Sequence, residues 1–365
     1  MNIKKIHLHN FRNYDNASFS FDSNAIHCLI GKNAQGKTNF IEAIYFLSHL
    51  HSFRTHSMSD LIQSNKEWMR INADIETLGH QEDVKVMISD QQRLLFHYQD
   101  PVKKYSDFVG IVNAILFCPD DMLLFKQSPR NRRRMIDIEL IKLSHTYTTT
   151  LSHYQKVLKE RNAALKQNTI NEVYIQTLTD QLIEDQLIIM NQRNEFVHRL
   201  YKEMMNLYPF FSSEKQTIQL KYQTFVELGE NLKERIQIAY QQSFERDCRY
   251  KQTTLGIHKD DLLFLFDDKL MSQVASQGQK RSVLLTLKLG LANIIYQAKK
   301  EYPILLLDDV FSELDTVRRQ QLIEHLPNNM QIFITTTEKM ESHWFKGRNV
   351  YIYQVEQGSL KEVSL

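Results

Sequence analysis

The chain has 365 residues, of which 42% are hydrophobic and 24% are charged, so it is long enough for two domains or one large domain with an insertion. Its formal net charge of +2 excludes global attraction to nucleic acid and leaves only local basic patches for that purpose. The three cysteines lack metal-ligand spacing, which suits a reducing cytoplasm and argues against a disulfide scaffold. We expect neither a signal peptide nor a membrane span.

The first twenty-one residues predict an antiparallel hairpin. Apolar residues alternate with polar ones over residues 3–8 and again over 19–21, with a polar turn at 13–16. Arg12 lies at the tip of this hairpin. It is either a solvated turn residue or a side chain that leans towards a bound nucleotide.

Residues 31–38 match the phosphate-loop pattern G-x-x-x-x-G-K-[ST]; in order they are Gly31, Lys32, Asn33, Ala34, Gln35, Gly36, Lys37 and Thr38. The glycines let successive N–H groups point at phosphate oxygens, Lys37 reaches the β- and γ-phosphates, and the Thr38 hydroxyl ligates Mg²⁺. An apolar strand at 25–30 precedes the loop, and helical spacing of apolar residues over 40–47 follows it. The alternative is a chance match, which the scarcity of glycine, 10 in 365, makes uncommon. This stretch therefore predicts nucleotide binding.

A set of short strands and then a basic segment follow. Alternating residues at 71–75, 84–88 and 94–98 predict antiparallel strands, and 115–118 predicts a buried strand. Residues 126–134 then hold five basic residues and no acidic one; they are Lys126, Arg130, Arg132, Arg133 and Arg134. This segment is either a solvated helix start or a patch that contacts DNA phosphates.

The middle of the chain predicts a helical lobe. Apolar seams over residues 135–208 indicate antiparallel helices with a break at 168–171, and Pro209 is expected to end the last helix. Short strands return after about residue 245, where 262–266 predicts one half of a hairpin.

A second anion-binding segment precedes the last apolar strand. Ser276, Gln277, Gly278 and Gln279 open an apolar helix, and such a helix start favours anions. A monomer with a complete phosphate loop does not need this surface. An oligomer that closes over the γ-phosphate from a neighbouring subunit does.

Residues 303–309 predict a buried strand that ends in two carboxylates. Ligands gather at the carboxyl ends of such strands, so Asp308 is placed to hold Mg²⁺ and Asp309 to orient or activate the attacking water. The alternative is a buried strand followed by an Asx turn. The upstream phosphate loop favours the magnesium interpretation.

These motifs together resemble the ABC-type ATPase heads of the SMC group. In those heads the segment 276–279 corresponds to the signature motif, and the D-loop corresponds to Ser312, Glu313, Leu314 and Asp315. The resemblance narrows to the RecF family of bacterial recombination mediators; the segments that carry it are residues 10–14, 119–121, 128–133, 256–261 and 308–315. RecF proteins usually have Pro and Arg where this chain has Ile257 and Lys259. Asp309 in place of the usual Glu, with only hydroxyls at 335–337, suggests slow hydrolysis suited to a switch.

The resemblance implies an α/β fold, with an ABC-type P-loop ATPase head built from residues 1–125 and 245–365 and a mostly helical lobe at 126–244. It implies ATP and Mg²⁺ as cofactors, with Lys37 and Asp309 as catalytic residues, and an ATP-dependent homodimer in which Ser276 contacts the ATP of the other subunit. It also implies binding to DNA at junctions of single and double strands, a RecR-type partner in recombinase loading, and a cytoplasmic, nucleoid-associated location without membrane contact.

Two other functions are compatible with the phosphate loop. A small-molecule P-loop kinase predicts a phosphate-acceptor pocket and no role for Ser276. A structural SMC-like chromosome protein predicts long coiled arms, which the short helical lobe of this chain does not supply.

Overall fold

The computed structural model describes residues 1–90, 92–212, 217–338, 342–345 and 347–363. The chain forms two compact units; unit 1 comprises Met1–Met122, Glu203–Ser213 and Gln277–Leu365, and unit 2 comprises Leu123–Lys202 and Glu214–Ser276. The predicted head began its second part at residue 245, whereas 245–276 lie in unit 2. Strand pairing explains this difference, because the strand that follows residue 260 pairs with a strand of unit 2.

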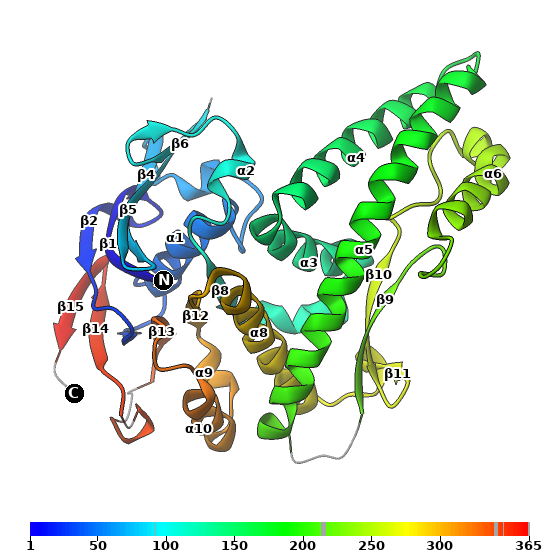
Figure 1. Ribbon diagram of the computed structural model, residues 1–365. Coiled ribbons are helices and arrows are strands. Elements are labelled where there is room, and N and C mark those ends of the chain that lie inside the picture. The colour runs from blue at the N-terminus through cyan, green and yellow to red at the C-terminus, as the bar shows by residue number, and fades with distance from the viewer. Residues whose placement is uncertain (91, 213–216, 339–341, 346, 364–365) are drawn as a thin grey trace. The chain divides into compact units, whose positions relative to one another are not determined.

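The central sheet of unit 1 has six strands in the order β15-β14-β3-β13-β12-β8. Figure 1 shows β14 and β15 side by side near the C-terminus. Their bounds are β3 (Ile26–Ile30), β8 (Ala114–Phe117), β12 (Ile304–Asp308), β13 (Ile332–Thr336), β14 (Val350–Glu356) and β15 (Ser359–Val363). All pairs are parallel except β14 with β15. The β12 and β13 strands are buried along their whole length, as continuous apolar runs in a parallel sheet predict.

A second sheet of unit 1 is antiparallel and has the order β2-β1-β4-β5-β6-β7. Its strands are β1 (Asn2–Phe11), β2 (Tyr14–Ser20), β4 (Trp68–Thr77), β5 (His80–Ser89), β6 (Arg93–His97) and β7 (Asp100–Pro101). Buried and accessible residues alternate along β4 and β5, so one face of the sheet packs on the core. The predicted N-terminal hairpin is therefore confirmed as β1 and β2.

The helices of unit 1 pack on these sheets, and one core joins them. The elements are α1 (Lys37–His49), α2 (Tyr105–Phe108), α8 (Gln277–Lys299), α9 (Val310–Glu313) and α10 (Thr316–His325), with 3₁₀ turns at Ser59–Leu61, Pro119–Phe125 and Ser342–Phe345. Phe40 of α1 lies in the same buried cluster as residues of both sheets. Phe21 lies 5.5 Å from Phe40 and 5.0 Å from Phe333 between ring centroids. This aromatic cluster fixes α1, and hence the loop before it, against the central sheet.

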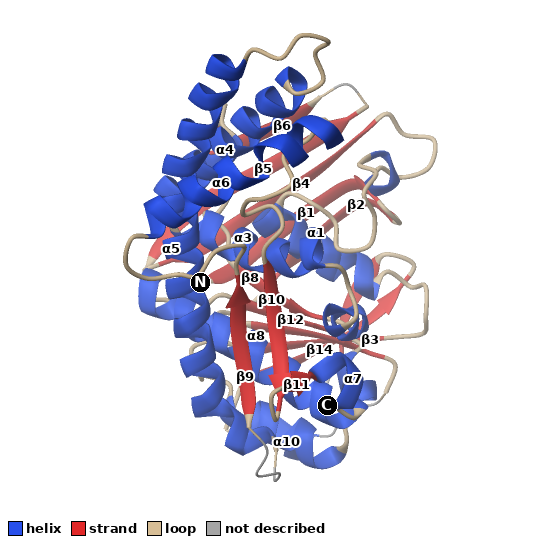
Figure 2. Ribbon diagram, turned by 90° about the vertical axis from the view of Figure 1, so that its right-hand side faces the viewer, coloured by secondary structure: helices blue, strands red, loops and turns tan. Residues whose placement is uncertain are grey.

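Unit 2 is mostly helical and contains a three-stranded sheet. Its elements are α3 (Pro129–Leu143), α4 (His145–Ala164), α6 (Leu232–Tyr250), α7 (Met271–Val274), β9 (Ile218–Gln223), β10 (Asp261–Phe266) and β11 (Lys269–Leu270). Figure 2 shows β9 and β10 side by side. Helix α5 (Glu172–Phe211) starts in unit 2 and its last residues belong to unit 1.

Pro209 does not end α5, contrary to the prediction, because the helix continues to Phe211. Proline removes one N–H, but the bond from the Ser212 N–H to the Tyr208 carbonyl, 3.1 Å, closes the last turn around it. Within the ranges that the structure describes, no helix is both long and apolar enough to cross a membrane.

Candidate nucleotide-binding site

The order of the central sheet brings three chemically active segments to one edge. Strand β13 lies between β3 and β12, and all three run in parallel. Asp308 at the end of β12 is in register with Thr335 of β13, which is in register with Leu29 of β3. The loop 31–36 leaves β3 at this edge. Ligand sites of α/β sheets form at such carboxyl ends.

The phosphate loop is braced by the two hairpins beside it. The Asn13 side chain donates to the Gln35 carbonyl at 3.1 Å, and the Tyr14 hydroxyl donates to the Gly36 carbonyl at 3.0 Å. The Gly358 N–H also donates to Gln35 at 3.0 Å. Gly36 has a φ of 115°, and a Cβ there would lie 2.7 Å from the Asn13 amide nitrogen. Both facts require glycine at this position.

Lys37 points back into the loop that precedes it. Its ammonium donates to the carbonyls of Gly31 and Lys32 at 2.7 and 3.0 Å, and the residue is buried. Burial lowers the pKa of Lys37, while the carboxylates of Asp309 and Asp308 act in the opposite direction. A buried ammonium held by neutral carbonyls gains most from an anionic ligand.

The half-buried Thr38 and the buried Asp308 and Thr335 form one hydrogen-bonded group. The Thr38 hydroxyl donates to Asp308 Oδ1 at 2.9 Å, and the Thr335 hydroxyl donates to the same oxygen at 2.7 Å. The Asp309 N–H donates to Thr335 Oγ1 at 3.0 Å. Burial raises the pKa of Asp308, and the two hydroxyl donors lower it. The sequence showed Thr335 only as one of several hydroxyls; its role depends on the register of β13 with β12.

The donor set at this point fits Mg²⁺. The Thr38 hydroxyl and the Asp308 carboxylate are oxygen ligands on neighbouring elements. Among the described residues, no group of three or more His, Cys, Asp or Glu side chains could enclose a metal. Mg²⁺ commonly takes one or two protein ligands and completes its shell with water and phosphate oxygens, so this pair suffices for it.

Asp309 begins the segment after β12 in a left-handed conformation, with a φ of 52°. Its carboxylate is half-buried, and burial raises its pKa while Lys37 lowers it. The charge of the phosphate-loop lysine is therefore felt at the Asp309 carboxylate.

Arg12 and Arg54 converge on a buried carboxylate of α1. Arg12 donates through Nε and Nη2 to Glu42 at 2.8 and 2.7 Å, so it is neither a freely solvated turn residue nor unpaired. Arg54 donates to the Asn39 side chain at 2.7 Å and lies 3.4 Å from Glu42. Burial raises the pKa of Asp308, and the charge of Arg54 opposes this. Sequence analysis missed Arg54, which no motif marks.

The expected signature and D-loop segments are linked within unit 1. Residues 277–279 form the first turn of α8, and Ser276 directly precedes it. Arg281 of α8 pairs with Glu313 at 2.6 Å, which ties the helix to residues 312–315. The Arg318 side chain adds a second link, since it donates to Ser282 of α8 at 3.1 Å.

The predicted DNA patch on α3 divides into two classes. Arg132 makes a two-pronged ion pair with the Asp261 carboxylate, with both bonds at 2.7 Å, and Arg133 donates to the Asp260 carbonyl. Burial lowers the pKa of Arg133. These two side chains hold α3 to residues 260–261. The exposed arginines of the set are Arg130 and Arg134, and Lys126, which precedes α3, is exposed as well.

The segment 256–261, one of those that carry the family resemblance, is largely a structural centre of unit 2. Arg193 donates to the Ile257 carbonyl at 3.1 Å, and Gln186 accepts from the Ile257 N–H at 3.1 Å. The Tyr222 hydroxyl donates to the buried Asp260 carboxylate. Burial raises the pKa of Asp260 to about 6, and Tyr222 and Arg193 oppose this rise.

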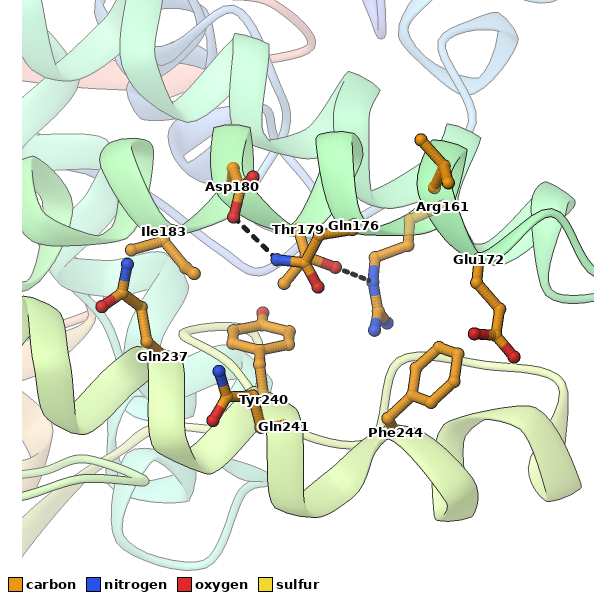
Figure 3. Close-up of a pocket in the computed structure, with 11 residues that line it drawn as sticks. Arg161, Glu172, Gln176, Thr179, Asp180, Ile183, Gln237, Tyr240, Gln241 and Phe244 are labelled. Carbon is orange, nitrogen blue, oxygen red and sulfur yellow. Dashed lines mark hydrogen bonds between the residues drawn. The ribbon is translucent and has the colours of Figure 1, made fainter.

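A cavity of about 520 Å³ in unit 2 is lined by residues of α4, α5 and α6 (Figure 3). Its arginine, Arg161, already donates to Thr179 and to Asp247, both at 2.9 Å. The carboxylates that line the cavity are Glu172 and Asp180. A satisfied cation and two carboxylates disfavour an anionic ligand.

Relatives of this chain cover its whole length. The family described as RecF/RecN/SMC N terminal domain matches residues 2–107. A protein named DNA replication and repair protein RecF, from Halalkalibacterium halodurans, is 37% identical over 370 residues, 99% of this chain and 100% of that protein. The chain belongs to the RecF family. A RecF protein from Oceanobacillus iheyensis is 36% identical over 98% of this chain and 99% of its own.

Solved structures confirm the fold class. The structure described as the recombination mediator protein RecF-ATP in the RecFOR pathway superposes with a TM-score of 0.91 at 26% identity, and covers 99% of this chain and 97% of that one. A crystal structure of an SMC head bound to ScpA has a TM-score of 0.56 at 15% identity, which is a likeness of fold alone. The expected ABC-type α/β head with an inserted, mostly helical lobe is therefore confirmed.

Proposed function

We propose that this RecF-family chain binds MgATP at residues 31–38 and uses it to control DNA binding in replication and repair. The observation that carries the proposal is the 2.9 Å bond between the Thr38 hydroxyl and Asp308 Oδ1, because it joins the two expected Mg²⁺ ligands at the end of the phosphate loop. The RecF structure described with ATP supports the choice of nucleotide.

Lys37 and Asp309 would carry the chemistry that the chain itself supplies. The Lys37 ammonium would exchange its two loop carbonyls for phosphate oxygens and so neutralise charge on the γ-phosphate. Asp309 would orient water and accept its proton, helped by the tether from its N–H to Thr335. Bound Mg²⁺ would polarise the phosphate oxygens, with Thr38 and Asp308 holding it. An aspartate reaches less far than the glutamate usual at this position, so we expect slow hydrolysis.

The first turn of α8 would close the site of a second subunit. Ser276 and residues 277–279 stand at a helix start that favours anions, and no step inside one subunit needs them. Two heads would then enclose two ATP molecules, and the dimer would bind DNA at single-strand gap junctions and help a RecR-type partner load recombinase.

The test is DNA binding with no nucleotide, with ADP and with ATP, measured beside sedimentation of the same samples. ATP and Mg²⁺ should produce both a dimer and tighter DNA binding, whereas ADP, which lacks the γ-phosphate, should produce neither. Ser276→Arg should keep ATP binding and lose the dimer. An ATP-dependent dimer that persists in this variant would refute the arrangement in which Ser276 of one head closes over the ATP of the other.

On α3, fewer arginines are available for DNA than the sequence predicted. Arg130 and Arg134 are exposed and available to phosphates, whereas Arg132 is occupied by Asp261. Arg130→Gln with Arg134→Gln should reduce the salt dependence of DNA affinity by about 1 per lost contact and leave folding unchanged. Arg132→Gln is the matched contrast, because it should lower the stability of unit 2. If the slope of log DNA affinity against log salt concentration is unaltered in the double variant, Arg130 and Arg134 do not contact DNA phosphates.

A further inference from the structure

One face of the antiparallel sheet of unit 1 is lined by cations and rings. Buried residues such as Ile71 and Val86 point to the core, and their neighbours along the strands point the other way. The strand register aligns the second set in two adjacent rows; one holds Asn16, His9, Arg70, Met87 and Leu94, and the other holds Ser18, His7, Asn72, Lys85 and Phe96. We call these two rows, with Trp68, the outer face.

The outer face presents aromatic surface in an accessible position. The rings of Trp68 and His9 lie 4.8 Å apart between centroids with 31° between their planes, and Trp68 is 36% exposed. The Lys85 ammonium lies 4.3 Å from the centre of the Phe96 ring. Leu94, beside Met87 in the register, is 39% exposed. The outer face therefore places apolar and aromatic surface beside cationic side chains on the accessible side of the sheet.

The charge of the outer face is positive. Arg70 and Lys85 stand in adjacent rows, and neither forms an ion pair with a carboxylate in the described parts of the chain. The Arg70 Nε is closed off from solvent and has no hydrogen-bond partner among the described residues. Acidic residues of these strands lie in the next row, where Asp74 faces Asp83 and the Asn72 amide donates to Asp83 at 3.1 Å. Two cations therefore flank the rings, and within the described ranges no carboxylate forms an ion pair with either of them.

We propose that the outer face binds single-stranded DNA, with bases stacked on Trp68 and Phe96 and phosphates at Arg70 and Lys85. Cations that follow the backbone and rings that take successive bases are what single-strand recognition requires. A duplex keeps its base faces stacked and cannot use the rings, and a protein interface would not favour lysine. The inference rests in part on the proposed function, because it takes DNA as the ligand and adds a site and a strand form.

The direct test uses tryptophan fluorescence. The chain has two tryptophans, so Trp344→Phe leaves Trp68 as the reporter. In the absence of ATP and ADP, titration of this variant with a single-stranded thymidine oligonucleotide should quench the fluorescence of Trp68 to saturation. A duplex of equal length should not quench it. A Trp68 signal that neither DNA changes would overturn the proposal. Equal quenching by duplex would overturn the stacking part of it.

Affinity measurements separate stacking from charge. Trp68→Ala should weaken single-strand binding about 5- to 150-fold, and Trp68→Phe should restore most of it. Arg70→Gln with Lys85→Gln should lower the slope of log affinity against log salt by about 1.4 in total. Tyr250→Ala is the matched control, because Tyr250 is an exposed ring, 61% accessible, in unit 2. Equal losses in the control and in Trp68→Ala would overturn the assignment.

The same samples distinguish this inference from the proposed function. ATP binding and the ATP-dependent dimer should be normal in Trp68→Ala, which also shows that the variant is folded. If folded Trp68→Ala binds single-stranded DNA with wild-type affinity, the proposed DNA binding by the outer face is wrong. The proposed control of DNA binding by ATP would be unaffected by that result. If single-stranded DNA quenches Trp68 but ATP has no effect on DNA binding, the result would support DNA binding at the outer face. It would refute the proposed control of DNA binding by ATP.

Discussion

The single substitution that tests the hydrogen-bonded group of the nucleotide site most directly is Thr335→Val. Valine keeps the shape of threonine and removes the hydroxyl that donates to Asp308 Oδ1 at 2.7 Å and accepts from the Asp309 N–H at 3.0 Å. Thr335 is fully buried and Asp308 is 5% exposed, so water does not readily replace the lost partner. We expect loss of stability and of the geometry of both carboxylates.

The size of the effect follows from the two bonds. A hydrogen bond to a charged group contributes about 1.5–3 kcal/mol, and a buried N–H left unpaired costs about 1–3 kcal/mol. Asp308 keeps its bond from Thr38, so the expected fall in the free energy of unfolding is about 2–4 kcal/mol. Loss of the donor also raises the pKa of Asp308 further, beyond the rise that burial causes. Mg²⁺-dependent ATP binding should then fail at a higher pH than in the wild type.

The assay combines denaturant unfolding with MgATP binding and turnover across pH. Turnover should fall more than ATP affinity, because the phosphate loop is untouched and the Asp309 tether is lost. Thr335→Ser, which keeps the hydroxyl, should restore both stability and the pH profile. A Val variant with wild-type stability and an unshifted pH profile would refute this account of Thr335.

Three further predictions concern single side chains. Lys37→Ala should abolish ATP binding with little change in stability, measured by calorimetry and thermal unfolding; normal binding would refute the phosphate-loop assignment. Asp309→Asn should bind ATP and prolong the dimer, because chemistry and not binding is lost; unchanged turnover would move the water-activating role elsewhere, for example to Glu313. The pKa of Asp260, raised from 3.8 to about 6, favours folding below pH 4, and this contribution disappears as the pH rises through 6. The contribution of Asp260 to the free energy of unfolding should therefore fall by about 2 kcal/mol between pH 4 and 7, and Asp260→Asn should remove that contribution; an equally steep profile in the variant would contradict this.

Local patterns carried much of the fold. The apolar run of β12, the alternation in β4 and β5 and the helical spacing after Gly36 each reflect forces between residues close in the chain, so the strands and α1 were predictable. The phosphate loop was predictable for the same reason, since its glycines and Lys37 act within a few residues of one another. The family resemblance was carried by short motifs of this kind.

Partners across long sequence separations were decided only by the tertiary structure. Arg132 and Asp261 are 129 residues apart, and nothing near Arg132 shows that its charge is already used. Thr335 acquires its role because β13 pairs with β12 in one register, which sets its hydroxyl on Asp308. The start of the second head segment was misplaced because β10 pairs with β9 and not with a strand of unit 1. Pairing of charges and strands depends on which surfaces meet in the folded chain, and a single sequence does not contain that information in any local pattern.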